Sequence, residues 1–142
     1  MNIRLELLAV AYRPGDELAG VFDLPEPIPS GTRSVELSVL WQGKGTPQPS
    51  VVHYERWRAG NDSLARLVTP YAFSLTLPTM PWSYEGKLVT IAWRVRVRVR
   101  YDSPEGRIDE VLREVPFVMS PTDEPIRPIL QPLLSQRAAS RA

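Results

Sequence analysis

A strict alternation of apolar and arginine residues around position 95 constrains the fold more than any other feature of the sequence. Over residues 88–101 one set of alternate side chains is apolar or aromatic, namely Ile91, Trp93, Val95, Val97, Val99 and Tyr101. The opposite set contains Arg94, Arg96, Arg98 and Arg100, which we call the arginine stripe. A period of two is that of a β-strand with one buried and one solvated face. At about 3.3 Å per residue such a strand extends about 45 Å, which predicts an elongated sheet.

The same period recurs along most of the chain. The further predicted strands are residues 2–11, 18–24, 34–42, 51–57, 71–77 and 107–119. Between the first two lies Pro14-Gly15, where proline sets φ for the first corner of a type II turn and glycine accepts the positive φ of the second. We therefore expect these two strands to form a hairpin. Seven strands with short turns predict an all-β, elongated antiparallel two-sheet sandwich of the immunoglobulin-like kind over residues 1–119.

The character of the chain changes at residue 120. Four prolines interrupt any strand, and the remaining residues predict an irregular C-terminal arm over residues 120–142 rather than a second domain. The arm carries an apolar cluster made of Ile126, Ile129, Leu130, Leu133 and Leu134. Such a segment needs a surface to cover, and both its own sandwich and a second subunit remain open as that surface.

The composition excludes several classes of chemistry. The 142 residues contain no cysteine and a single histidine, His53, so that thiolate nucleophiles, disulfides and Cys/His zinc sites are excluded. A lone histidine in a strand is usually packed or solvated rather than catalytic. We therefore expect no enzyme, no cofactor and no metal. The net charge of +1 gives no general attraction to nucleic acid, and the N-terminus lacks a signal region, which predicts a cytoplasmic protein without a transmembrane segment.

Five segments, in order, resemble the N-terminal domain of the arrestin family, which includes arrestin-domain adaptors, the arrestin-shaped retromer subunit and bacterial sporulation-control proteins. They are YRPGDELAGVF at residues 12–22, VELSVLWQG at 35–43, FSLTLP at 73–78, PWSYEG at 81–86 and IAWRVRV at 91–97. The last two are the most specific, because a proline, a serine, an aromatic residue and a glycine lead into a long alternating strand. The resemblance covers about residues 3 to 118.

This resemblance implies a scaffold or adaptor fold that recognises peptides, membrane-protein tails or partner domains, without a family-wide catalytic activity. The sequence departs from the family in two respects. Arrestins generally place two such domains in tandem, whereas this chain has one. Receptor arrestins read phosphorylated tails with basic residues on the first strand, and here that strand offers only Arg4. We therefore do not extend phosphopeptide recognition to this protein.

The arginine stripe supports two interpretations. Four guanidinium groups about 6.6 Å apart could bind a row of phosphates on nucleic acid or phospholipid. Alternatively, they pair with acidic residues of neighbouring strands, and this interpretation is favoured because the net charge is close to zero. The candidate partners are Glu6, Glu36, Glu55, Asp109, Glu110 and Glu114.

Of the four tryptophans, Trp41 and Trp93 are in phase with core positions, whereas Trp82 lies in a predicted loop and is a candidate contact residue. The leading hypothesis is a non-catalytic protein-interaction module that acts as an adaptor, a scaffold or an assembly subunit, with a second copy of itself as one candidate partner. The candidate binding residues are the arginine stripe, Trp82 and the apolar cluster of the arm. The alternative function is a binder of phosphate-rich ligands through the stripe.

Overall fold

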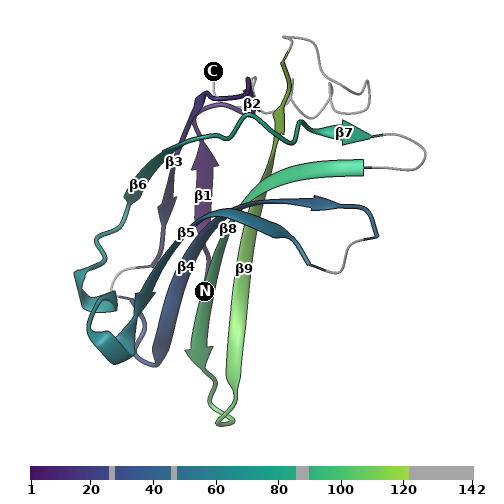
Figure 1. Ribbon diagram of the computed structural model, residues 1–142. Coiled ribbons are helices and arrows are strands. Elements are labelled where there is room, and N and C mark those ends of the chain that lie inside the picture. The colour runs from purple at the N-terminus through teal and green to yellow at the C-terminus, as the bar shows by residue number, and fades with distance from the viewer. Residues whose placement is uncertain (26–27, 46–47, 86–89, 122–142) are drawn as a thin grey trace.

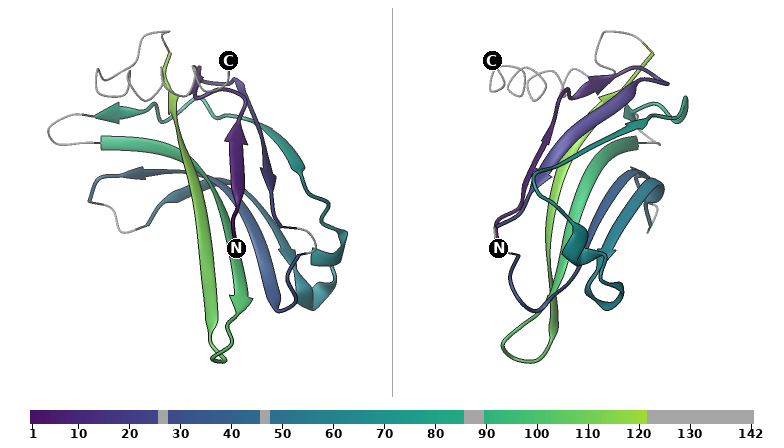
Figure 2. Two further views of the ribbon diagram at one scale, coloured as in Figure 1. Left: turned by 180° about the vertical axis from the view of Figure 1, so that it is seen from behind. Right: turned by 90° about the vertical axis from the view of Figure 1, so that its left-hand side faces the viewer.

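The protein folds into two β-sheets packed face to face in a computed structural model, which describes residues 1–25, 28–45, 48–85 and 90–121. Its strands are β1 (Arg4–Leu7), β2 (Ala11–Tyr12), β3 (Glu17–Asp23), β4 (Thr32–Gly43), β5 (Ser50–Arg58), β6 (Tyr71–Thr76), β7 (Tyr84–Glu85), β8 (Thr90–Asp102) and β9 (Ile108–Met119). The small sheet has the order β1-β3-β6, and the large sheet has the order β2-β9-β8-β4-β5 with β7 beside β8. Figures 1 and 2 show the two layers. The predicted all-β sandwich is confirmed.

Strand β8 lies at the centre of the large sheet, between β4 and β9 (Figure 1). Its apolar side chains Trp93, Val95, Val97 and Val99 are buried in the core, and the arginines on the other face remain half-buried. The alternation therefore predicted which side chains face the core. The first two residues of the predicted strand, 88 and 89, lie outside the described residues.

The first predicted strand is not continuous, and this prediction was wrong. β1 pairs with β3 as the expected hairpin partner, from Arg4 opposite Asp23 to Leu7 opposite Gly20. Beyond Leu7 the chain crosses to the other sheet, where β2 pairs in parallel with the end of β9. The reason is a change of phase: the buried side chains are spaced by two up to Leu7, but the next one is Val10, three residues later.

The turn at Pro14-Gly15 has the geometry that its sequence predicts. Gly15 has a φ of +83°, and the amide of Asp16 donates a hydrogen bond of 3.0 Å to the carbonyl of Arg13. These are the features of a type II turn with glycine at its third position. The turn leads the chain from β2 back into the small sheet at β3.

At Gly20 the small sheet leaves no space for a side chain. A Cβ atom at this position would lie 2.6 Å from the backbone oxygen of Glu6 and 2.7 Å from the Cζ of Phe73. Glycine is therefore required here because the neighbouring strand and an aromatic ring occupy the space of a side chain.

Three of the tryptophans contribute to the core. Trp93 is almost fully buried, and its Nε1 donates a hydrogen bond of 2.8 Å to the carbonyl of Pro81. Trp41 is half-buried against the core, as is Trp57, which packs edge-on against Tyr71 with ring centroids 4.9 Å apart. The expectation that Trp41 and Trp93 fill the sandwich is confirmed, whereas the role of Trp57 was not predicted.

After β5 the chain forms two short 3₁₀ turns, η1 (Ala59–Asn61) and η2 (Leu64–Arg66). Within the described ranges, no helix is long and apolar enough to cross a membrane. Of the predicted arm, only Ser120 and Pro121 are described. Its apolar cluster, made of Ile126, Ile129, Leu130, Leu133 and Leu134, lies outside the described residues.

Candidate binding surface

The arginine stripe lies on the outer face of the large sheet, between acidic residues of the two neighbouring strands. On β9, Glu114 accepts hydrogen bonds of 2.7 Å from the Nε atoms of both Arg94 and Arg96 at the same oxygen, Oε2. On β4, the Oε1 of Gln42 accepts a second hydrogen bond, of 3.0 Å, from the Nη2 of Arg94. One carboxylate thus orients two guanidinium groups at this end of the stripe. The Glu114 pair is our name for Arg94 and Arg96 together with the carboxylate of Glu114 that they share.

These contacts shift the protonation equilibrium of Glu114. Partial burial alone would raise the pKa of this carboxyl group, but the hydrogen bonds and positive charges of Arg96 and Arg94 outweigh burial and lower its pKa below the ordinary value. Glu114 therefore remains ionised in mildly acidic solution.

The other two arginines of the stripe are held less tightly. The Nε atoms of Arg98 and Arg100 lie 3.6 Å and 3.7 Å from the Oε2 of Glu110 on β9. Arg100 also lies 3.7 Å from the Oε2 of Glu36 on β4, whose carboxylate is almost fully buried. All four arginines of the stripe therefore have a carboxylate within 4 Å, so that the cross-strand pairs favoured by the sequence are present.

Glu36 lies at the centre of the region around Arg98 and Arg100. The hydroxyl group of Tyr54 on β5 donates a hydrogen bond to its Oε1. Partial burial, and then the hydrogen bond to Glu36, raise the pKa of Tyr54 above its ordinary value. The carboxylate is thus held from one side by a neutral phenol on β5 and approached from the other by the guanidinium of Arg100 on β8.

The same region contains every buried side-chain polar atom without a hydrogen-bond partner among the described residues. These atoms are the Oγ of Ser34, the Oε2 of Glu36 and the Nε of Arg98. Glu36 and Arg98 are directly opposite each other on β4 and β8, and Ser34 is two residues from Glu36 on the same face. The hydrogen-bonding capacity of this part of the face is therefore incompletely used.

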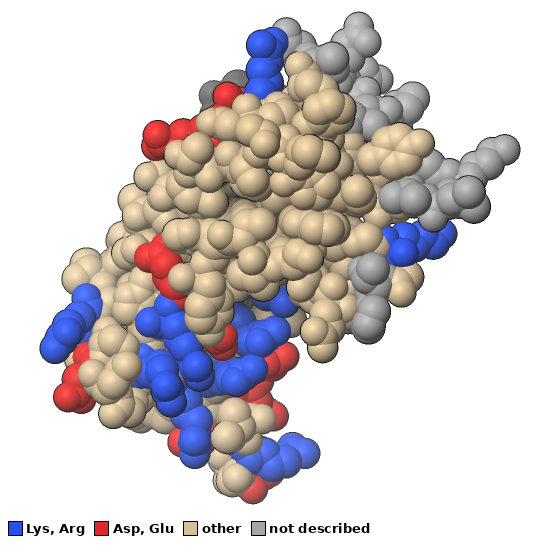
Figure 3. Space-filling model, viewed as in Figure 1, with Lys and Arg blue, Asp and Glu red and all other residues tan. Residues whose placement is uncertain are grey.

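Strand β5 adds two further arginines to this face. Arg56 is opposite Glu36 and Arg58 is opposite Ser34, which places both on the same side of the sheet as the stripe. Both are exposed, and neither has a carboxylate within 4 Å in the part of the chain that the structure describes. Figure 3 shows Lys and Arg side chains gathered in its lower half. The set of Arg56, Arg58, Arg94, Arg96, Arg98 and Arg100, with Glu36, Glu110 and Glu114, is called the arginine face below.

The structure places the sequence-predicted residues in different parts of the molecule. The stripe is brought together with Glu36, Glu110 and Glu114. Of the other expected partners, Glu6 lies beside Arg4 on the small sheet, Glu55 points to the inner side of β5, and Asp109 is opposite Tyr101 on the face of β9 away from the stripe. Trp82 is 47% exposed on the connection between β6 and β7, and its Nε1 donates a hydrogen bond of 3.0 Å to the carbonyl of Thr79. Trp82 thus remains a separate exposed residue.

The single histidine belongs to a group of polar residues that joins the two sheets. His53 is half-buried, with its Nε2 2.9 Å from the Oε2 of Glu55. The other oxygen of Glu55 accepts a hydrogen bond from the hydroxyl group of Tyr71 on β6. This hydrogen bond, together with burial, raises the pKa of Tyr71 to about 12. These contacts connect β5 of the large sheet to β6 of the small sheet.

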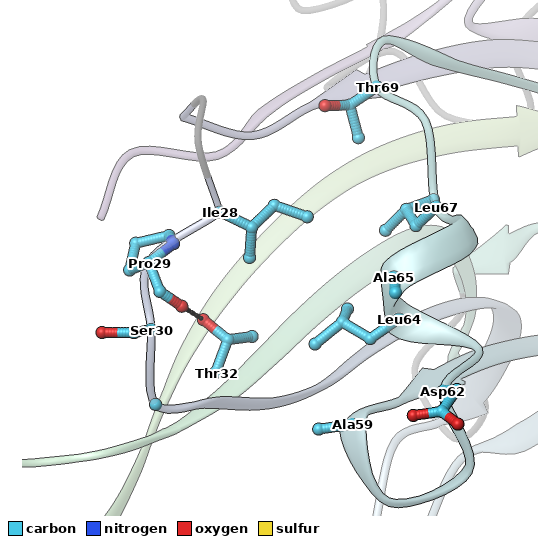
Figure 4. A pocket seen from close by; sticks show the side chains of 11 residues that line it. Ile28, Pro29, Ser30, Thr32, Ala59, Asp62, Leu64, Ala65, Leu67 and Thr69 are labelled. Carbon is cyan, nitrogen blue, oxygen red and sulfur yellow. Dashed lines mark hydrogen bonds between the residues drawn. The ribbon is translucent and has the colours of Figure 1, made fainter.

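An open pocket of about 820 Å³ lies at the end of the sandwich that holds the 3₁₀ turns (Figure 4). It is formed by the connection before β4 and by the segment between β5 and β6, and its walls include Ile28, Leu64 and Leu67 with Thr32 and Thr69. The hydroxyl group of Thr32 already donates a hydrogen bond to the carbonyl of Pro29. This pocket could not be predicted from the sequence, because its two walls are distant along the chain and neither has a recognisable motif.

The chain matches no protein-family model and no curated protein sequence. Among solved structures it is similar to Spo0M, a sporulation control protein from Bacillus subtilis, with 15% sequence identity and a TM-score of 0.45 over 83% of this chain and 48% of that one. It is also similar to murine CRIg, with 11% identity and a TM-score of 0.40 over 84% of this chain and 99% of that one. The protein thus spans about half the length of the Spo0M chain.

Proposed function

We propose that the protein is a non-catalytic protein-interaction module of the cytoplasm, which acts as an adaptor, a scaffold or an assembly subunit. The observation that carries this proposal is the arginine face, where six arginines outnumber three glutamates on one side of the large sheet. An array of partly or fully exposed guanidinium groups is suited to binding the carboxylates of a protein partner, because each group can form two parallel hydrogen bonds with one carboxylate.

The carboxylates of this face support binding by orienting the arginines in advance. Arg94 and Arg96 are bound through Nε to Glu114, and their side chains are less than one quarter exposed. A side chain that is already ordered loses less conformational entropy when a partner binds. The arginine face therefore has lower ordering costs than an equal number of freely moving lysines or arginines.

The sequence resemblance to arrestin-like adaptors agrees with an interaction role. We further propose that the C-terminal arm contributes to assembly, either by covering its own sandwich or by binding a second copy. Light scattering of the full chain and of a variant ending at residue 119 tests this part of the proposal. A smaller oligomer after truncation supports docking on a second copy, whereas equal masses contradict it.

The interaction role is tested by affinity capture from the native organism with three baits, followed by quantitative mass spectrometry. The baits are the full chain, the variant R96Q/R98Q, and a control variant R107Q/R113Q, which removes the same charge outside the arginine face. We expect protein partners that are retained by the full chain and the control but lost from R96Q/R98Q. Thermal unfolding of each bait checks that the variants are folded.

Two results would contradict this role. If R96Q/R98Q retains every partner of the full chain, the stripe is not a protein-binding surface. If the bound material is nucleic acid or phospholipid, with binding that weakens steeply as salt is added, the phosphate-binding function replaces the proposed one.

A further inference from the structure

Within the described part of the chain, strand β5 is an edge of the large sheet. Among the described residues it pairs with β4 alone, from Ser34 opposite Arg58 to Trp41 opposite Ser50. An antiparallel strand at the edge of a sheet directs the backbone N–H and C=O groups of alternate residues away from its neighbour, where an additional strand can bind them. β5 has 9 residues, long enough for such pairing.

The side chains of β5 differ between its two faces. On the outer face, Tyr54, Arg56 and Arg58 are exposed, and the two arginines have no ion pair within the described ranges. On the inner face, His53, Glu55 and Trp57 are half-buried against the sandwich. A strand added beside β5 would therefore meet positive charge on one face and an aromatic and polar surface on the other.

We propose that β5 binds an extended partner segment in which acidic residues alternate with apolar ones, as an additional antiparallel or parallel strand. This inference rests on the proposed interaction function and names its site and its partner. Successive side chains on one face of an extended segment are about 6.6 Å apart in both strands, so that two carboxylates match Arg56 and Arg58 without a change of register. Directly opposite side chains lie about 5 Å apart, within reach of an ion pair.

Arg56 and Arg58, which have no ion pair among the described residues, favour an acidic partner. Peptides that add to a sheet edge gain affinity from backbone hydrogen bonds and specificity from alternate side chains. Arg56 and Arg58 repel a basic strand because the charges are alike. A neutral strand would remove water from the two guanidinium groups without offering them an opposite charge. A carboxylate at the opposite position supplies the counter-charge that Arg94 and Arg96 already receive from Glu114.

Other occupants fit the edge less well. A nucleic acid offers phosphates to the arginines but cannot satisfy an alternating row of backbone N–H and C=O groups. A second copy of the chain that pairs through its own β5 brings the same two arginines to the contact and no carboxylate on the outer face of that strand. Oligonucleotide binding and dimerisation are therefore measured alongside peptide binding.

The test uses a synthetic peptide of about seven residues that alternates glutamate with valine, with glutamine and lysine peptides of the same pattern as controls. Affinity is measured by fluorescence titration, and the site by the amide NMR signals of β5. We expect the glutamate peptide to bind at least about tenfold more tightly than the glutamine peptide, with slowed hydrogen exchange on β5. The lysine peptide should not bind.

Two kinds of variant separate strand addition from simple charge attraction. R56Q/R58Q should reduce the affinity for the glutamate peptide at least about tenfold, whereas R107Q/R113Q, which removes the same charge elsewhere, should leave it nearly unchanged. Two forms of the glutamate peptide, each N-methylated on one of the two sets of alternate residues, should differ in their affinity for the protein. The form methylated at the amides that face β5 should lose binding, because a methylated amide cannot donate.

Equal affinity of the full chain and R56Q/R58Q, or equal affinity of the two N-methylated peptides, overturns the β5 site. Stronger binding of an oligonucleotide than of the glutamate peptide, or dimerisation that R56Q/R58Q abolishes, also overturns it. These results are independent of the capture experiment. When R56Q/R58Q is added to the capture experiment as a fourth bait, partners lost from R96Q/R98Q but kept by R56Q/R58Q support the interaction function and contradict this edge. Capture of no protein partner contradicts the function itself.

Discussion

The two ends of the arginine face use the same residue type in different ways. In the Glu114 pair, two guanidinium groups share one carboxylate at hydrogen-bonding distance. Around Glu36, the charges are 3.6 to 3.7 Å apart, three polar atoms lack a hydrogen bond, and Arg56 and Arg58 have no counter-charge in the described part of the chain. Arginines on one face of a sheet thus differ in their counter-charge because different residues lie beside them on the neighbouring strands.

The largest expected effect comes from Glu36→Ala. Removing this carboxylate leaves Arg100 and Arg98 partly buried with less counter-charge and leaves the hydroxyl group of Tyr54 without its acceptor. Breaking a buried charge cluster in this way typically costs about 3 kcal/mol, so we expect the free energy of unfolding to fall by about that amount. Urea denaturation measures the change. Glu105→Ala, in the exposed β8–β9 turn, is the control, and an equal loss in both variants would contradict a special role of Glu36.

A smaller effect, with a definite pH dependence, is expected for Glu114→Gln. The folded state lowers the pKa of Glu114, so its ionised form stabilises the protein above the pKa of the unfolded chain, and this contribution is lost as the pH falls through the folded pKa. Because the side chain is 36% exposed, we expect a loss of only about 1 kcal/mol at neutral pH. Denaturation at neutral pH and well below pH 4 provides the measurement. If the original protein and Glu114→Gln still differ in their free energy of unfolding at the lower pH, the substitution disturbs packing instead.

The smallest effect on stability is expected for R56Q/R58Q. Both arginines are exposed and lack an ion pair among the described residues, so their replacement should change the free energy of unfolding by less than about 0.5 kcal/mol. A comparison by urea denaturation with R94Q, which removes a partner of Glu114, should show the larger loss in R94Q. If R56Q/R58Q is instead the less stable variant, these arginines have a structural role and the contrast between the two ends fails.

Much of the large sheet could be predicted because its side chains alternate. The burial of Val95, Val97 and Val99 and the common face of the stripe both follow from a period of two. The acidic partners were only partly predicted, since Glu36, Glu110 and Glu114 are opposite the stripe whereas Glu6 and Glu55 are not. A sequence shows which face of its own strand a residue occupies, but not which strand lies beside it.

The unpredicted features depend on register and on contacts between distant segments. Arg56 and Arg58 join the arginine face only because Glu36 is opposite Arg56, and a shift of one residue would turn both to the other side. The crossing after Leu7 had a visible signal, because the spacing of apolar residues changes from two to three before Val10. The pocket had none, since Ile28 and Leu64 meet only in the folded chain.

The short strand β2 makes closure of the sandwich depend on both ends of the domain. Ala11 is opposite Val118 and Tyr12 is opposite Met119, so the N-terminal crossing can be fixed only after β9 has left the ribosome. Contacts between such remote positions slow folding, because a long stretch of chain must be ordered before they form. A nascent chain that stops before β9 therefore lacks the strand that contacts both β1 and β2 in the folded sandwich, and we expect its apolar side chains to be more exposed to aggregation.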